Sequence, residues 1–226
     1  MIDNSENVAV IIPCFNEEKT ISKVINSFKE NIPKAKIYVC NNNSSDKTKE
    51  LAIASGAVVL DELQKGKANA VENLFRNIDA DYFILTDGDM TYDSSISESA
   101  LEYLKKSKSD MLIGTRKNAS SSKEIYRPGH RFGNRAFTLI LKLMFSGNLK
   151  DVLSGYRIFT KRFVKSIPIL SKGFDIEVEI TIHALSLNLK ICEYDINYYE
   201  RPEGSISKLN TFKDGFLIIK TILKLF

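Results

Sequence analysis

Two aspartates separated by one glycine follow a short apolar run, in the stretch Tyr82-Phe83-Ile84-Leu85-Thr86-Asp87-Gly88-Asp89. Because side chains alternate along an extended chain, Asp87 and Asp89 are expected to point the same way just past the end of a strand. Their carboxylates suit a divalent cation such as Mg²⁺ or Mn²⁺, which proteins often share with substrate phosphates. We therefore predict a catalytic metal site at this pair, with an ordinary solvated turn as the alternative.

The charged residues are unevenly distributed along the 226-residue chain. Residues 1–115 carry 13 basic and 18 acidic groups, whereas residues 116–165 carry 12 basic and 2 acidic groups. An acidic first half followed by a strongly basic segment predicts an anionic partner. A nucleic acid is disfavoured, because the basic residues are not interleaved with aromatic platforms and the aspartate pair would have no role.

The cysteines and the apolar tracts bear on the location of the chain. Three cysteines without a CxxC pattern indicate small core residues in a reducing compartment. The first residues are polar and acidic, unlike a signal peptide. The longest apolar tract, residues 216–226, is broken by two lysines and is too short to span a bilayer. We expect a cytoplasmic chain that is not integral to a membrane.

The order of apolar runs predicts an α/β protein. Continuous apolar runs predict buried strands near residues 8–13, 36–40, 57–60, 82–86, 110–114 and 190–197. The sequence predicts one helix that begins at residue 16 and another that ends near residue 77. Further helices are predicted over about residues 47–55, 95–106, 175–187 and 211–226, the last with a clear apolar stripe. This alternation predicts a mostly parallel sheet with helices on both faces.

Six polar motifs occur in an order that resembles a known family. They are Ile12-Pro13-Cys14-Phe15-Asn16-Glu17-Glu18, Asn42-Asn43-Ser44-Ser45-Asp46-Lys47-Thr48, Lys65-Gly66-Lys67, Asp87-Gly88-Asp89, Asp151-x-x-Ser154-Gly155-Tyr156-Arg157 and Tyr199-x-Arg201-x-x-Gly204-Ser205. Together they resemble the family 2 glycosyltransferases, and the last two resemble the dolichol-phosphate mannose synthase branch of polyprenyl-phosphate glycosyltransferases. The resemblance covers about residues 8–210.

The resemblance implies a GT-A (Rossmann-like) catalytic domain over residues 1–210 and a metal-dependent, inverting hexosyltransferase. The donor would be a UDP- or GDP-linked hexose and the acceptor a polyprenyl or dolichyl phosphate. The implied nucleotide-binding residues are Pro13, Asn16, Glu17, Asn41, Asp46, Lys67 and Asp87. The family usually has an acidic residue where Asn41 stands, so the choice between uridine and guanosine stays open.

A lipid phosphate acceptor is chemically consistent with the residues present. A phosphate monoester has a second pKa of about 6, so it is largely deprotonated at neutral pH and needs little help to attack. A metal at the aspartate pair, together with Lys67, would neutralise the departing diphosphate. Arginine pairs bidentately with phosphate, so we predict an acceptor clamp in which Arg157 is also catalytic. Its members are Arg131, Ser154, Arg157, Arg201 and Ser205.

Two amphipathic segments predict docking on a membrane surface. Residues 137–145 form an apolar block beside several basic residues, and residues 211–226 combine an apolar stripe with three lysines. For the first segment, the alternative is a core helix whose basic residues face the solvent. We expect a peripheral protein at the inner face of the membrane. Whether a membrane-spanning region follows residue 226 stays open.

A soluble GT-A glycosyltransferase that extends a polysaccharide or a lipid-linked glycan is the alternative function. It needs a general base to activate a neutral hydroxyl. Asp175, Glu177 and Glu179 are candidates for that base. The basic middle segment favours the phosphate acceptor.

Overall fold

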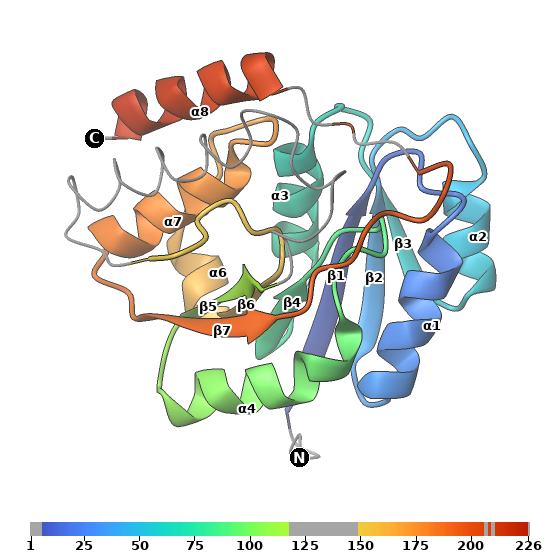
Figure 1. Ribbon diagram of the computed structural model, residues 1–226, viewed down its shortest axis with the longest axis horizontal. Coiled ribbons are helices and arrows are strands. Elements are labelled where there is room, and N and C mark those ends of the chain that lie inside the picture. Colours follow the sequence, from blue (N-terminus) through green and yellow to red (C-terminus); the bar gives the residue numbers. More distant parts are fainter. Residues whose placement is uncertain (1–5, 118–148, 206–207, 209–210, 226) are drawn as a thin grey trace.

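The computed structural model describes residues 6–117, 149–205, 208 and 211–225 (Figure 1). Within these ranges a seven-stranded sheet has the order β3-β2-β1-β4-β6-β5-β7. The strands are β1 (Val8–Cys14), β2 (Lys36–Asn41), β3 (Val58–Asp61), β4 (Tyr82–Leu85), β5 (Met111–Arg116), β6 (Arg157–Thr160) and β7 (Ile191–Ile196). Only β6 among them runs antiparallel to its neighbours. The predicted α/β fold with a mostly parallel sheet is confirmed.

Helices cover both faces of the sheet, as expected (Figure 1). They are α1 (Ile21–Asn31), α2 (Thr48–Ala54), α3 (Lys67–Asn77), the short 3-10 helix η1 (Ser94–Ile96), α4 (Ser97–Lys106), α6 (Lys161–Ser166), α7 (Ile176–Ser186) and α8 (Thr211–Leu225). The helices α1, α2 and α4 contribute to the core on one face, whereas α3, α6 and α7 contribute to the core on the other. The last helix, α8, packs on the outside of α7.

The central strand β1 shows why both faces are covered. Val8, Val10 and Ile12 belong to one core layer, whereas Ala9 and Ile11 belong to the other. Adjacent side chains on a strand point to opposite faces, so a continuous apolar run requires a cover on both sides. The polar residues that follow these strands are therefore left at the carboxyl edge of the sheet.

The strand β6 and the helix α6 were not predicted from the sequence. The strand begins at Arg157, where the pattern indicated a polar loop, and it inserts between β4 and β5. Thr160 then caps α6, because its side chain accepts a hydrogen bond from the backbone N–H of Phe163. The insertion places the loop before β6 next to the end of β4, where the aspartate pair lies.

Helix α7 is mostly apolar and is buried between the sheet and α8. Ile176 and Ile180 pack toward the sheet, while Val178 and Ile182 pack toward α8. A helix that is hydrophobic all round is a buried helix. Glu177 on α7 is also buried, so its carboxylate requires a partner.

Candidate active site

The first two motifs are joined at the carboxyl ends of β1 and β2. The backbone N–H of Asn16 donates to Oγ of Ser44 (3.0 Å), and the N–H of Ser45 donates to Oδ1 of Asn16 (2.8 Å). The N–H of Glu17 donates to Oγ1 of Thr48 (2.8 Å). Because these bonds fix residues 16 and 17 in a loop, the helix predicted from residue 16 begins only at Ile21.

Asp46 braces the same loops with its carboxylate. It accepts hydrogen bonds from the backbone N–H groups of Glu18 (3.1 Å) and Thr48 (3.0 Å). Pro13 lies in β1 opposite Cys40 of β2. A nucleotide contact from Pro13 or Asp46 stays a prediction, but the loops that would make it are tied together.

Asn41, at the end of β2, has a carboxylate beside it. Its Nδ2 donates to Oδ1 of Asp61 (2.9 Å), and its Oδ1 accepts from the N–H of Ser44 (3.3 Å). The hydrogen bonds from Asn41 and from Lys49 hold the pKa of Asp61 below its usual value. A carboxylate at the end of β3 thus lies beside Asn41, at the end of β2.

Lys67 joins two carboxylates that are far apart in the sequence. Its Nζ lies 2.5 Å from Oδ1 of Asp87 and 2.6 Å from Oε1 of Glu177. The side chains of Lys67 and Glu177 are 10% and 6% exposed, whereas that of Asp87 is 26% exposed. Burial opposes the charge of Lys67, yet the two carboxylates raise the pKa of its ammonium above its ordinary value. The predicted site residues Lys67 and Asp87 are therefore in direct contact.

Gly155 packs against the ion cluster that Lys67, Asp87 and Glu177 form. A Cβ added at Gly155 would lie 2.6 Å from Oδ2 of Asp87 and 3.2 Å from Nζ of Lys67. The backbone N–H of Gly155 donates to the hydroxyl oxygen of Tyr92 (2.8 Å), and Tyr92 is also a neighbour of Asp87 in the pocket described below. The close approach explains why a glycine stands at this position of the motif.

The segment after β7 brings two basic residues, Arg201 and Lys208, to two acidic residues of the motifs, Asp89 and Glu17. The guanidinium of Arg201 bonds to Oδ2 of Asp89, whose second oxygen accepts from Oγ1 of Thr91 (2.6 Å). The ammonium of Lys208 bonds to the carboxylate of Glu17. Burial raises the pKa of Glu17, and the bond from Lys208 opposes that shift. Arg201 thus lies at the aspartate pair, and its part in a phosphate clamp stays a prediction.

Arg157 does not face the site, contrary to the prediction. It is fully buried, and its guanidinium donates to the carbonyl oxygens of Val152 (2.7 Å) and Ser154 (3.1 Å) and to Oγ1 of Thr181 (2.9 Å). Burial lowers its pKa to about 10. Ser154 is fully buried as well. Neither side chain is placed to clamp an acceptor phosphate, and Arg157 instead fixes the loop that carries Gly155.

Arg116 holds the same loop and was missed by the sequence analysis. Its Nε and Nη2 each lie 2.7 Å from an oxygen of Asp151, and its guanidinium lies over the ring of Tyr198. Of the remaining clamp residues, Arg131 lies outside the described residues. The hydroxyl of Ser205 is buried and has no hydrogen-bond partner within the described part of the chain.

Two of the three carboxylates considered as a general base serve the fold. Glu179 accepts hydrogen bonds from the backbone N–H groups of Leu170 (2.7 Å) and Ser171 (2.9 Å). Asp175 accepts from Oγ1 of Thr221 on α8 (2.7 Å). Of the three, only Glu177 reaches the ion cluster, and Lys67 already neutralises it.

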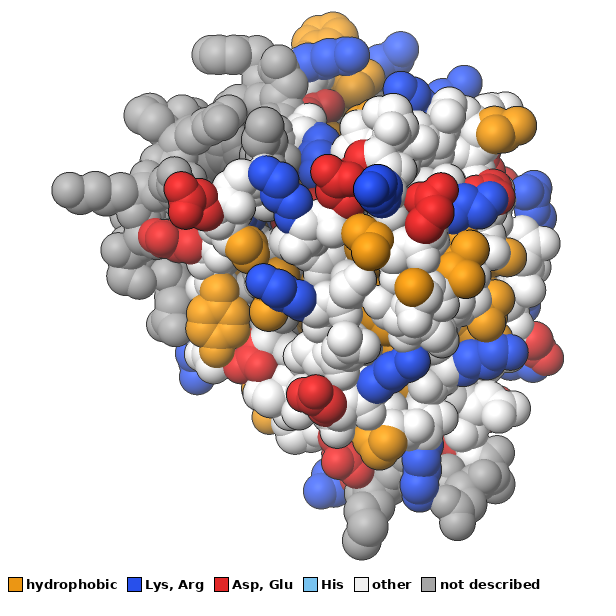
Figure 2. Space-filling view, turned by 90° about the vertical axis from the view of Figure 1, so that its right-hand side faces the viewer, with side chains coloured by type: hydrophobic (Ala, Val, Ile, Leu, Met, Phe, Trp, Pro, Cys, Tyr) orange, Lys and Arg blue, Asp and Glu red, His pale blue; other side chains and the backbone are white. Residues whose placement is uncertain are grey.

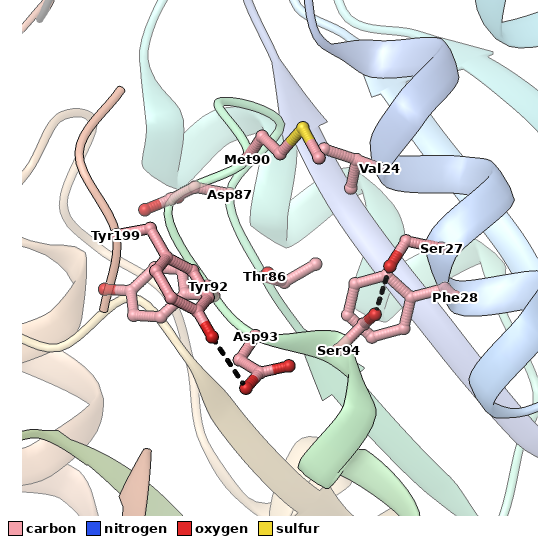
Figure 3. A pocket seen from close by; sticks show the side chains of 10 residues that line it. All are labelled: Val24, Ser27, Phe28, Thr86, Asp87, Met90, Tyr92, Asp93, Ser94 and Tyr199. Atoms are coloured by element: carbon pink, nitrogen blue, oxygen red, sulfur yellow. Dashed lines mark hydrogen bonds between the residues drawn. The ribbon is translucent and has the colours of Figure 1, made fainter. Parts of the chain in front are cut away.

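A small pocket lies beside Asp87, between α1 and the segment that follows β4 (Figure 3). Val24, Ser27 and Phe28 line it from α1, and Tyr92 and Tyr199 lie across from them (Figure 3). The hydroxyl of Tyr199 donates to the Asp93 carboxylate (3.2 Å). The pocket includes Asp87 of the pair and presents apolar, aromatic, hydroxyl and carboxylate groups.

The residues at the end of β4 fit a divalent cation. Within the described ranges, no three His, Cys, Asp or Glu side chains gather closely enough to hold a metal by themselves. Two carboxylates are nonetheless sufficient for Mg²⁺ or Mn²⁺ when phosphate oxygens complete the coordination. Asp87 and Asp89 are the residues that would hold it.

The doubly covered sheet, with acids and cations at the carboxyl ends of its parallel strands, defines a GT-A fold of the kind that binds nucleotide sugars. Residues 9–167 match the model of "Glycosyl transferase family 2", and the chain belongs to this family. It is a glycosyltransferase that uses a nucleotide-sugar donor.

Several known proteins are similar to the chain. It is 33% identical over 215 residues to glycosyltransferase AglJ of Haloferax volcanii, covering 93% of this chain and 69% of AglJ. It is 26% identical over 221 residues to a dolichyl-phosphate hexose transferase of the same organism, covering 97% and 93%. Glucosyl-3-phosphoglycerate synthase from Mycobacterium tuberculosis, solved with Mn²⁺ and UDP, has a TM-score of 0.77 at 20% identity over 98% of this chain and 80% of that one.

Proposed function

We propose that the protein transfers a hexose from a UDP- or GDP-linked donor to a polyprenyl or dolichyl phosphate at a membrane surface. The observation that carries the proposal is the pairing of Asp87 with Lys67 and of Asp89 with Arg201 at one edge of the sheet. A divalent cation at the two aspartates and the ammonium of Lys67 would neutralise the diphosphate as it departs. The related synthase solved with Mn²⁺ and UDP supports this use of the fold.

The acceptor assignment follows from what the site offers a nucleophile. Of the three carboxylates considered as a general base, Asp175 and Glu179 serve the fold and Glu177 is bound to Lys67. A phosphate monoester needs no such base, because it is largely ionised at neutral pH. One of its oxygens would attack the anomeric carbon. The bond from that carbon to the diphosphate breaks, the nucleoside diphosphate leaves with the electron pair, and the configuration inverts.

Arg201 and Ser205 are the described residues that we assign to the acceptor phosphate. Arg201 is at Asp89, so a phosphate bound to its guanidinium would lie next to the donor diphosphate. The buried hydroxyl of Ser205 is four positions further along the same loop. Arg131, outside the described residues, stays a predicted member of this group.

The exposed face of α8 supports docking on a membrane. Ile218 and Ile222 pack inward, whereas Phe216 and Leu223 are 69% and 73% exposed. Lys213, Lys220 and Lys224 are exposed on the same helix. Apolar side chains flanked by lysines suit an anionic lipid surface, where each cation contributes about 1 kcal/mol. Within the described residues no helix is long and apolar enough to cross a bilayer.

The side of the molecule that carries α1 and α2 differs from α8. There, lysines and arginines are interspersed with aspartates and glutamates, and the hydrophobic side chains are scattered (Figure 2). A surface of this kind is ordinary for a soluble protein. We therefore assign docking to α8 together with residues 137–145, which lie outside the described ranges.

A transfer assay tests the proposed acceptor. The protein is incubated with Mn²⁺ and labelled UDP- or GDP-hexoses, with polyprenyl phosphate in anionic vesicles or with soluble acceptors. We expect label in the organic phase only when the lipid carries its phosphate, and no label on the parent polyprenol. Transfer to a soluble sugar or to phosphoglycerate, with none to the lipid, would establish the soluble alternative.

A further inference from the structure

Glu177 has a partner but no role in the reaction as described so far. It is the second residue of α7, and its side chain is 6% exposed. Its Oε1 lies 2.6 Å from Nζ of Lys67, the first residue of α3. The same ammonium lies 2.5 Å from Oδ1 of Asp87. One lysine is therefore shared between a buried carboxylate and the carboxylate of a candidate metal ligand.

This sharing has a consequence for the binding of a cation at Asp87. A divalent cation competes with Lys67 for that carboxylate, and binding draws the carboxylate away from the ammonium. A buried charge that loses its partner is strongly destabilised, so Lys67 would resist the exchange if Asp87 were its sole counter-ion. Since Glu177 also holds Lys67, the ammonium keeps one carboxylate when Asp87 turns to the metal.

We propose that Glu177 is a positioning residue that retains Lys67 while Asp87 binds the divalent cation, and that it thereby sets the metal affinity of the site. This inference rests on the proposed function, because it requires a metal at Asp87 and Asp89. Glu177 does not touch the metal or the sugar in this role. It acts through Lys67, and it also keeps that ammonium beside the diphosphate that the metal binds.

The surroundings of Glu177 fit this role better than that of a general base. Gly155 packs against both Asp87 and Lys67, which leaves no space for a side chain at that position. The buried guanidinium of Arg157 also interacts electrostatically with Glu177. A buried carboxylate that interacts with two cations is well placed to act as a counter-ion.

The test is a Mn²⁺ titration of the full chain, followed by the electron paramagnetic resonance of free Mn²⁺, with and without UDP or GDP. Glu177→Gln keeps the size of the side chain and removes its charge. We expect its dissociation constant for Mn²⁺ to rise about ten- to a hundredfold, the usual effect of removing a group that supports a metal ligand. Glu72→Gln, at an exposed position of α3, is the matched control and should leave the constant unchanged.

A double variant separates this role from a purely structural one. In Lys67→Met/Glu177→Gln the competing ammonium is absent, so nothing needs to be retained and the net charge equals that of the wild type. We expect Mn²⁺ affinity to return to within about threefold of the wild-type value or to exceed it, because coupled residues give non-additive effects. If the double variant binds Mn²⁺ as weakly as Glu177→Gln, the inference is overturned.

The remaining outcomes are also decisive. Equal Mn²⁺ affinity of the wild type and Glu177→Gln would overturn the inference but leave the proposed metal site intact. A wild type that binds no Mn²⁺ under any of these conditions would contradict the proposed metal site itself. If Glu177→Gln unfolds, two variants replace it. One is Glu177→Asp, which keeps the charge on a shorter side chain, and the other is the double variant. Weaker Mn²⁺ binding by Glu177→Asp than by the double variant would then support the inference, and equal wild-type affinity of both would overturn it.

Discussion

The guanidinium of Arg201 contacts Oδ2 of Asp89, with 2.9 Å between Nε and that oxygen, although 112 positions separate the two residues. The contact fixes the loop after β7 on the aspartate pair that follows β4. The group that we assign to the acceptor phosphate is thus in contact with a residue that we assign to the donor. Binding at either place is expected to affect the other.

Replacing Arg201 should change metal binding and transfer in opposite directions. In Arg201→Gln a cation that competes for Asp89 is removed, so Mn²⁺ affinity should rise about threefold, the effect of a partly exposed ion pair. Transfer should fall on the order of a hundredfold, because a charged phosphate contact is lost. Mn²⁺ titration and initial rates check both effects. Arg162→Gln, which removes a pair with Asp110 elsewhere on the surface, is the control. A parallel loss of Mn²⁺ affinity would refute the competition.

Arg157→Met should destabilise the fold. The substitution removes hydrogen bonds to the carbonyls of Val152 and Ser154 and to Thr181, all in the interior. The expected loss in the free energy of unfolding is about 3 kcal/mol, measured by urea denaturation. Arg162→Met, at a surface pair, should cost less than about 1 kcal/mol. An unchanged stability with a raised KM for the lipid phosphate would restore Arg157 to the acceptor site.

Gly155→Ala should impair transfer more than stability. The new methyl group would lie 2.6 Å from Oδ2 of Asp87, so that carboxylate and Lys67 must shift. A displacement of about 1 Å in an active site lowers the rate on the order of a hundredfold. Gly215→Ala is the control, because a Cβ at Gly215 on α8 meets no atom within 4 Å. Equal rates in the two variants would show that the contact between Gly155 and Asp87 is not critical.

The exposed apolar side chains of α8 should govern binding to anionic vesicles. In Phe216→Ser/Leu223→Ser two side chains with 69% and 73% exposure are replaced without disturbing the face packed on α7. Co-sedimentation should fall about tenfold or more, because the burial of one apolar side chain contributes about 1.5–3 kcal/mol. Wild-type binding should also weaken as salt rises. Leu187→Ser, on an exposed leucine outside α8, is the control. Salt-independent binding, or no change in the double variant, would exclude α8 as the docking face.

The parts of the fold that depend on local pattern were predicted from the sequence. The apolar run before Asp87 predicted β4, and its polar end predicted a site at the carboxyl edge of the sheet. Asp87 and Lys67, taken from separate motifs, indeed lie in contact. Parallel strands bring their carboxyl ends to one edge, so residues that follow different strands meet there.

The errors concern residues whose partners lie far away in the sequence. Arg157 follows a polar stretch and was predicted to bind the acceptor phosphate, because nothing in the local pattern shows that β6 carries it into the core. The role of Glu177 depends on α3 and α7 meeting at Lys67, which the sequence pattern alone does not show. A signal for Glu177 was present, since a charged residue in a mostly apolar, buried helix must find a buried partner.

The most direct test of the central claim is the ³¹P NMR spectrum of the acceptor before and after reaction. With the donor, Mn²⁺ and polyprenyl phosphate in detergent, attack by a phosphate oxygen converts the phosphate monoester into a sugar phosphodiester. We predict that the monoester resonance is replaced by a diester resonance in step with the release of nucleoside diphosphate, and that Asp89→Ala abolishes the change. Release of nucleoside diphosphate with sugar transferred to a hydroxyl group, while the monoester resonance persists, would contradict the proposed acceptor.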